Sequence, residues 1–360
     1  MSDQSFRTIV HPSISGRAAR ITLSNEYGIA PVTFRAASVA IRASDAGIRP
    51  GTAVTVTFGG AREVVVAAGA SVLSDAVAID FAFGQDLAVS YHVPSIVPQV
   101  TGSGVTAFSK TSYGTAPGAG DRAGDTTGAE FPTVNTFVPF LTRLDADSPA
   151  TAATVVAFGD SITEGTLSTP DSNTDYPARL ADRIQAAGMP VSVVNAGIGG
   201  NSVLPCSQLE PLFGRSALDR FARDVLAVPN VRTVIINEGG NDVRFCGRTA
   251  VEVQAGLRQL IDAAHAAGLK VFLGTYVPRV SRTVIFADMV PDSFGDDQRQ
   301  ALNAWIRART DVTVIDFDRA LTETSENRQR PETGSPDAIH PGAAGYAMMA
   351  DIVPLAALIP

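Results

Sequence analysis

Four short polar blocks in the second half of the chain hold the residue types of nucleophilic catalysis. They are Gly159-Asp160-Ser161, Gly199-Gly200-Asn201, Gly240-Asn241-Asp242 and Asp337-Ala338-Ile339-His340. A serine hydroxyl is a poor nucleophile near neutral pH unless a base lies within hydrogen-bond reach. Histidine suits that role, and a carboxylate on its other ring nitrogen fixes the tautomer. We therefore predict Ser161 as nucleophile, His340 as general base and Asp337 as the residue that orients the imidazole.

The same blocks contain donors for the negative charge that develops on a carbonyl oxygen under attack. Such an oxyanion needs hydrogen-bond donors that are already in place. The backbone N–H of Ser161, the backbone N–H of Gly200 and the side-chain amide of Asn241 could supply them. Glycine at 200 also lets the backbone approach a substrate with no side chain in the way.

Unbroken apolar runs place these blocks at the ends of buried strands. The runs are Thr154–Phe158, Val191–Val194, Val231–Ile236, Val271–Leu273 and Val312–Ile315. Apolar runs without alternation are typical of strands covered on both faces, as in a parallel sheet. The first three blocks follow the first three runs, and the last block follows the fifth. Since ligands bind beyond the carboxyl ends of such strands, we expect all four blocks to share one edge of the sheet.

Helical patterns separate the runs. Thr249 and Glu252 form a capping box before apolar residues at helical spacing, and Gly268 ends that helix. A second helix opens at Ser216, with an inward face predicted from Leu218, Phe221, Ala222 and Val225. Further helices are predicted from Pro177, around Leu302, Trp305 and Ile306, and from Ala343. Alternating strands and helices predict an α/β fold with right-handed crossovers.

The first half of the chain has a different hydrophobic period. Apolar and polar residues alternate in short segments such as Arg20–Ser24, Val54–Phe58 and Leu87–Tyr91. Short alternating segments rich in β-branched residues are typical of antiparallel strands. We predict an all-β sandwich or jelly roll over residues 1–148 and the α/β domain over residues 149–360.

The four blocks resemble, in order and spacing, those of the SGNH (GDSL) hydrolases. The resemblance implies a flavodoxin-like five-stranded parallel sheet of order 2-1-3-4-5. It also implies the same catalytic set, namely Ser161, Asp337 and His340, with Ser161, Gly200 and Asn241 as oxyanion donors. The first half looks like the β-domain of a bacterial subgroup of secreted GDSL-like lipases/acylhydrolases, on Arg7–His11 and Arg20–Gly28. That subgroup implies export, although Met1–Ser5 does not look like the start of a signal peptide.

The residues and the resemblance together predict a carboxylic ester hydrolase that cleaves short-chain acyl esters, acetylated sugars included, through an acyl-serine intermediate. A pocket wall is predicted from Tyr276, Val277, Ile285 and Phe286, because these apolar residues follow the fourth strand. The alternatives are an acyltransferase, a lipase or thioesterase with the same residues, and a carbohydrate-binding protein whose catalytic blocks are relics. The alternative to a pocket wall is that these four residues only pack the loop.

Two cysteines, Cys206 and Cys246, each come soon after an oxyanion block. We expect them to lie on loops of neighbouring strands. These loops are expected to meet at the same edge of the sheet, so a disulfide is one reading, and it would suit an exported protein. Two unrelated buried thiols are the other reading.

Composition excludes several classes of partner. Against 36 acidic residues the chain has 28 basic ones, so the net charge is −8, which argues against binding nucleic acid. No apolar run approaches the length of a membrane span. Dinucleotide and Walker motifs are not met, and the other histidines show no metal-ligand spacing, so neither a cofactor nor a metal is predicted. A small-molecule or carbohydrate ester is the expected partner.

Overall fold

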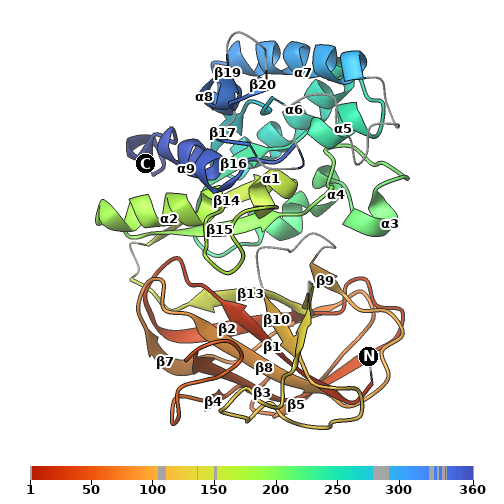
Figure 1. Ribbon diagram of the computed structural model, residues 1–360, viewed down its shortest axis with the longest axis vertical. Helices are drawn as coiled ribbons and strands as arrows, with labels where there is room; N and C mark the ends of the chain where they lie inside the picture. Colours follow the sequence, from red (N-terminus) through yellow and green to blue (C-terminus); the bar gives the residue numbers. More distant parts are fainter. Residues whose placement is uncertain are drawn as a thin grey trace. The chain divides into compact units, whose positions relative to one another are not determined.

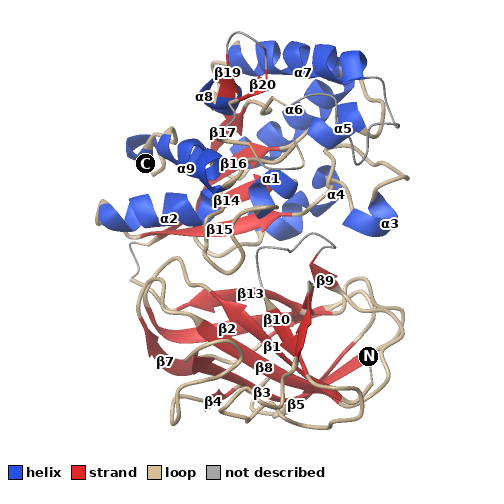
Figure 2. Ribbon diagram, in the orientation of Figure 1, coloured by secondary structure: helices blue, strands red, loops and turns tan. Residues whose placement is uncertain are grey.

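The computed structural model of the protein describes residues 2–103, 111–135, 137–149, 152–278, 292–323, 328–330, 332–334, 337 and 339–359. Contacts within the chain divide it into two compact units, Met1–Ala150 and Thr151–Pro360. The first unit is built of strands, whereas the second alternates strands with helices (Figure 1, Figure 2).

Two antiparallel sheets make up most of the first unit. The larger contains β1 (Gln4–Val10), β3 (Val32–Ile41), β4 (Val54–Thr55), β5 (Glu63–Val66), β8 (Leu87–Val93), β10 (Ser112–Gly114) and β11 (Thr133–Asn135). The smaller contains β2 (Gly16–Ser24), β6 (Ser71–Leu73), β7 (Val77–Phe81) and β13 (Leu141–Ala146). The short strands β9 (Gly102–Ser103) and β12 (Val138–Pro139) pair separately. The larger sheet runs β11-β10-β1-β8-β3-β4 with β5 on β3, and the smaller runs β13-β2-β6 with β7 on β2.

Apolar side chains from both sheets share one core. Ile21 on β2, Phe34 on β3 and Tyr91 on β8 are completely buried in it. The rings of Phe34 and Phe140 meet edge to face with centroids 5.1 Å apart, a favourable arrangement of aromatic quadrupoles. A core between two antiparallel sheets confirms the prediction of an all-β first domain.

The second unit contains one five-stranded parallel sheet. Its strands are β14 (Ala153–Gly159), β15 (Val191–Gly197), β16 (Val231–Asn237), β17 (Lys270–Gly274) and β18 (Thr313–Ile315). Their order is β15-β14-β16-β17-β18, which is 2-1-3-4-5 when they are counted along the chain. Every residue of β14 is buried, as expected for a strand covered on both faces. The prediction of a flavodoxin-like sheet is confirmed.

Helices connect these strands and cover the sheet. They are α1 (Ser161–Glu164), α2 (Tyr176–Ala186), α3 (Glu210–Phe213), α4 (Ala217–Phe221), α5 (Gly240–Arg244), α6 (Ala250–Ala266), α7 (Asp292–Arg307), α8 (Phe317–Leu321) and α9 (Ala343–Asp351), with a short β19 (Thr322–Glu323) and β20 (Arg328–Gln329) pair between α8 and α9. Side chains of α4, α6 and α7 share an apolar core with the sheet. The predicted capping box is present, since Thr249 N donates to Glu252 Oε2 at 2.9 Å and Glu252 N to Thr249 Oγ1 at 3.4 Å. In the described part of the chain, no helix has both the length and the apolar character that crossing a membrane requires.

The buried face of α4 differs from the prediction. Ala222 is exposed, and Arg220 is buried instead, beside Ala217 and Phe221. A π-helical turn over Ala222–Leu226 follows α4 directly. Val225 within this turn is buried as predicted, so the difference lies in Ala222 and Arg220, and Arg220 can be buried because its guanidinium donates to acceptors such as the carbonyl oxygen of Gly159.

The strand register brings three of the polar blocks to one edge of the sheet. Gly159, the last residue of β14, pairs with Gly197 of β15 and with Asn237 of β16. The three strands therefore end at the same level, and the loops that follow them start side by side. This is the crevice beyond the carboxyl ends of the strands where α/β sheets bind ligands.

Candidate active site

A tight turn between β14 and α1 presents Ser161. Asp160 is the N-cap of this short helix, and its Oδ1 accepts a hydrogen bond from Ile162 N at 2.9 Å. A Cβ on Gly159 would lie 2.3 Å from the carbonyl oxygen of Asn237, so only glycine fits there. Ser161 is 9% exposed and stands at the start of the helix, where backbone N–H groups point outward.

The structure brings Ser161, His340 and Asp337 together in one chain of hydrogen bonds. His340 Nε2 lies 2.7 Å from Ser161 Oγ, and His340 Nδ1 lies 2.5 Å from Asp337 Oδ2. The other oxygen of Asp337 accepts from the backbone N–H groups of Ile339 at 2.9 Å and His340 at 3.0 Å. The carboxylate thus fixes both the imidazole and the backbone that carries it.

Gly200 lies on the loop after β15, and Asn241 lies in the first turn of α5, which contacts that loop. Asn241 Nδ2 donates to the carbonyl oxygen of Asn201 at 2.7 Å, so the amide is held beside the loop that contains Gly200. A carboxamide nitrogen has two hydrogens, and this bond uses one of them. Gly200 has a φ of +75°, and a Cβ there would lie 2.3 Å from the ring of Phe213. Both the conformation and the close ring require glycine at this position.

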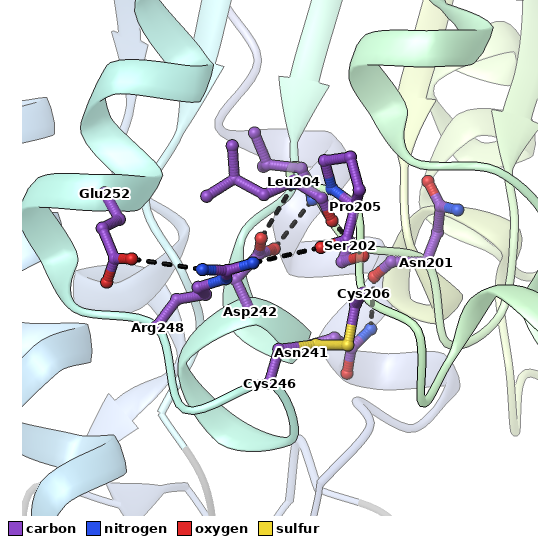
Figure 3. Close-up of a disulfide and its surroundings, with 11 residues drawn as sticks. Asn201, Ser202, Leu204, Pro205, Cys206, Asn241, Asp242, Cys246, Arg248 and Glu252 are labelled. Carbon is purple, nitrogen blue, oxygen red and sulfur yellow. Dashed lines mark hydrogen bonds and ion pairs between the residues drawn. A yellow bond between two sulfur atoms is a disulfide. The ribbon is translucent and has the colours of Figure 1, made fainter.

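The loop after β15 is tied to α5 and the turn that follows it in several ways (Figure 3). Asp242 accepts two backbone hydrogen bonds, from Val203 N at 2.8 Å and from Leu204 N at 2.9 Å. Cys206 and Cys246 form a disulfide, with an S–S distance of 2.13 Å. Burial raises the pKa of Asp242 to about 7.

The prediction that the two cysteine loops follow neighbouring strands is wrong. These loops follow β15 and β16, which are not neighbours in the sheet, because β14 lies between them. The loops meet beyond the end of β14, where the shared register of Gly159, Gly197 and Asn237 brings all three strands to an end. The disulfide therefore joins loops from strands on either side of the one that carries Ser161.

Comparison with known proteins identifies the second unit. A family model, the GDSL-like Lipase/Acylhydrolase family, matches residues 157–348, which is more than half of the 360-residue chain. The chain belongs to this family. A GDSL-family chain is a hydrolase, and the match includes the turn of Ser161 and the segment of His340.

Solved structures that the chain matches come from several bacteria. A member of the lipolytic protein G-D-S-L family from Veillonella parvula DSM 2008 is 23% identical, with a TM-score of 0.40, over 56% of this chain and 95% of that chain. The native aryl esterase of M. smegmatis is 16% identical, with a TM-score of 0.46, over 55% of this chain and 95% of that chain. No curated protein matches the chain.

A buried arginine is hydrogen-bonded to groups that lie next to the GDSL site. Arg220 of α4 donates to the carbonyl oxygens of Gly159 at 2.9 Å and Ala196 at 2.8 Å, and to Asn201 Oδ1 at 2.8 Å. Its guanidinium group also lies 4.0 Å from the centre of the Phe158 ring. It thus connects the ends of two strands with the loop beside Gly200. Sequence reasoning missed this residue, because nothing in the sequence distinguishes it from the many other arginines.

Glu238 is a second buried residue that sequence reasoning missed. Its side chain is fully buried with Oε2 3.8 Å from Arg220 Nη2, and among the described residues neither carboxyl oxygen has a hydrogen-bond partner. Burial raises the pKa of Glu238 well above its ordinary value, with a further contribution from the charges of Asp160 and Asp242. Arg220 opposes this shift without cancelling it.

The raised pKa of Glu238 predicts how the stability of the protein depends on pH. A carboxyl group that stays protonated in the folded state costs stability as pH rises from its ordinary pKa toward the raised one. Glu238→Gln removes that titration, so the melting temperature of the variant relative to wild type should increase as pH rises from about 4.3, the ordinary pKa of glutamate, into the neutral range. Glu130→Gln, at an exposed ion pair with Arg122, is the matched control and should follow wild type at every pH. A difference for Glu238→Gln that is constant across this range would show that Glu238 is ionised in the folded protein.

The structure describes two of the four residues that were predicted to line a pocket. Tyr276 is half-buried, and its hydroxyl donates to Asp160 Oδ2 at 2.9 Å. Val277 is 1% exposed. Ile285 and Phe286 lie outside the described residues. The structure therefore places Tyr276 beside the turn of Ser161, while the pocket wall stays a prediction.

Proposed function

We propose that the chain is a carboxylic ester hydrolase that acts through an acyl-serine intermediate. The observation that carries this proposal is the continuous hydrogen-bond chain from Ser161 Oγ through the His340 imidazole to Asp337 Oδ2. With its Nδ1 proton held by Asp337, the imidazole presents the lone pair of Nε2 to the serine hydroxyl. That arrangement generates the nucleophile that acyl transfer requires.

The proposed reaction has two steps. Ser161 Oγ attacks the acyl carbonyl carbon while His340 Nε2 takes the hydroxyl proton, and the tetrahedral oxyanion receives hydrogen bonds from Ser161 N–H, Gly200 N–H and the Asn241 amide. His340 then gives its proton to the departing alcohol as the ester C–O bond breaks. In the second step His340 activates a water molecule, which hydrolyses the acyl-serine and restores the enzyme.

We propose short acyl groups as the preferred substrates, on small-molecule or carbohydrate alcohols. The contact of the Phe213 ring with Gly200 supports this, because an aromatic ring occupies the space next to a proposed oxyanion donor. A series of p-nitrophenyl esters of increasing acyl length tests the proposal. We expect kcat/KM to be highest for acetate or butyrate and to fall for longer chains. A maximum at long chains would favour a lipase.

We further propose that the first unit is an accessory domain and that the protein works in an oxidising compartment. The disulfide between Cys206 and Cys246 supports the second point, because disulfides persist outside the reducing cytoplasm.

The oxyanion assignment predicts a clear loss of activity. Asn241→Ala removes a donor to the developing charge and should lower kcat by about 10²- to 10³-fold with little change in KM. Steady-state kinetics on a short aryl ester measures both constants. Asn241→Asp is the second variant to measure, because it keeps the side-chain shape but, like Asn241→Ala, has no N–H to donate to an oxyanion or to the carbonyl of Asn201. Wild-type kcat in both variants would remove Asn241 from the proposed oxyanion hole.

A further inference from the structure

Tyr276 links the turn of the proposed nucleophile to a second element of the site. Its hydroxyl donates to Asp160 Oδ2 at 2.9 Å, while Asp160 Oδ1 accepts from Ile162 N at 2.9 Å. The carboxylate of the residue before Ser161 is therefore held from both sides. One of its partners is the first turn of α1, and the other is a side chain from the loop after β17.

The same phenol ring lies directly on the turn that carries Asn241. A Cβ built on Gly240 would lie 1.6 Å from Tyr276 Cζ and 1.9 Å from its hydroxyl oxygen. The ring thus fills the space that any side chain at position 240 would need. Tyr276 is in contact with both turns at once, one before the proposed nucleophile and one before a proposed oxyanion donor.

The backbone of Tyr276 is fixed independently of those two turns. Asn303, a buried residue of α7, accepts from Tyr276 N through Oδ1 at 2.7 Å and donates to Tyr276 O through Nδ2 at 2.8 Å. Two hydrogen bonds from one amide hold the two peptide groups on either side of the Tyr276 Cα in a single orientation. The phenol therefore extends from a rigid base toward Asp160 and Gly240.

We propose that Tyr276 is a positioning residue for ester hydrolysis, whose hydroxyl acts through Asp160 to hold Ser161 in register with the Asn241 amide. This inference rests on the function proposed above. Catalysis needs the nucleophile and the oxyanion donors at fixed mutual positions in the transition state, whereas substrate binding depends on them less. Loss of the hydroxyl should therefore lower kcat and leave KM nearly unchanged.

The pH at which Asp160 takes up a proton provides a second measurement of the role of Tyr276. Burial raises the pKa of Asp160, while the hydrogen bonds from Ile162 and Tyr276 and the charges of His340 and Arg220 lower it. The titratable or charged groups that interact with this carboxylate are Tyr276, His340, Arg220, Glu238, Tyr176 and Tyr346. Without the phenol donor the carboxylate takes up a proton at higher pH. The acid limb of the kcat/KM profile should then move to higher pH in Tyr276→Phe.

The test is the kinetics of Tyr276→Phe, which keeps the ring over Gly240 and removes only the hydroxyl. We expect kcat on a short aryl ester to fall by about 10- to 100-fold, as for loss of a hydrogen bond to a charged group, with KM within about twofold of wild type. Tyr91→Phe is the matched control. Its buried hydroxyl donates to the carbonyl of Pro139 in the first unit, so this variant should lose stability but keep kcat within about twofold.

A double-mutant cycle shows whether Tyr276 acts through Asp160. Asp160→Ser keeps a side-chain oxygen that can cap α1, but the shorter side chain cannot reach the phenol. In that background Tyr276→Phe should change kcat by less than about twofold. Equal losses in both backgrounds, or a change confined to KM, would overturn the inference.

The outcomes separate this inference from the proposed function. A wild-type protein that hydrolyses no ester, with Ser161 unreactive toward a fluorophosphonate, would refute the function itself. An active wild type, together with Tyr276→Phe at wild-type kcat and an unmoved acid limb, would refute only the role of Tyr276.

Discussion

Replacing Ser161 by alanine is expected to lower kcat on a short aryl ester by about 10⁶-fold, as far as loss of a serine nucleophile lowers it in other serine hydrolases. His340 Nε2, at 2.7 Å from Ser161 Oγ, would then have no hydroxyl to deprotonate. The remaining rate would come from the oxyanion donors and from substrate binding alone. Hydrolysis of p-nitrophenyl acetate, followed at the absorbance of the released phenol, measures the loss.

Ser168→Ala is the matched control for this variant. Ser168 is also buried in the second unit, at 4% exposure, and among the described residues its hydroxyl has no hydrogen-bond partner. We expect it to keep wild-type kcat. Turnover by Ser161→Ala at the wild-type rate would show that the reaction uses another nucleophile.

Replacing Asp337 by asparagine is expected to lower kcat by about 10⁴-fold while the fold is kept. The asparagine carbonyl can still accept from the N–H groups of Ile339 and His340, so the segment keeps its shape. The amide nitrogen, however, would face His340 Nδ1 as a donor. This favours the tautomer with its proton on Nε2, which cannot take a proton from Ser161.

Steady-state kinetics with a melting curve tests this second expectation. Asp351→Asn is the control, because Asp351 has a side chain that is 71% exposed and lies 3.7 Å from Arg183. That variant should behave as wild type. A loss of less than about tenfold in Asp337→Asn would mean that Asp337 does not set the tautomer of His340.

Much of the second unit could be predicted from local patterns. Unbroken apolar runs marked the five strands of the sheet, and the pair Thr249 and Glu252 marked the start of α6. These signals are local, because a strand buried on both faces has no polar period and a capping box closes within one turn. The four blocks could be placed at one edge because parallel strands all end on the same side.

The pairing of strands in the first unit could not be predicted in the same way. Phe6 on β1 pairs with Tyr91 on β8, far along the chain, and β8 lies between β1 and β3. Alternation identifies which side of a strand is buried, but many pairings bury the same side. The pairing is decided by side-chain packing across the whole sandwich.

The buried polar residues around the site were also beyond sequence reasoning. Buried Arg220 and Asp160 find their partners on other segments of the chain, namely the carbonyl oxygen of Gly159 and the half-buried Tyr276, and buried Glu238 lies 3.8 Å from Arg220. Burial of a charged group is tolerated only with such partners, and they come together only in the folded chain. The sequence shows residue types, whereas the partners depend on the register of β14, β15 and β16.

The most direct test of the central claim is to trap the acyl-enzyme. Wild-type protein is mixed with p-nitrophenyl acetate, quenched in acid within the first turnover and digested for mass spectrometry. We predict one acetyl group on the peptide that contains Ser161, and none on that peptide in Ser161→Ala. Turnover without any acetylated Ser161, or acetylation of another residue that proceeds equally in Ser161→Ala, would contradict the proposed mechanism.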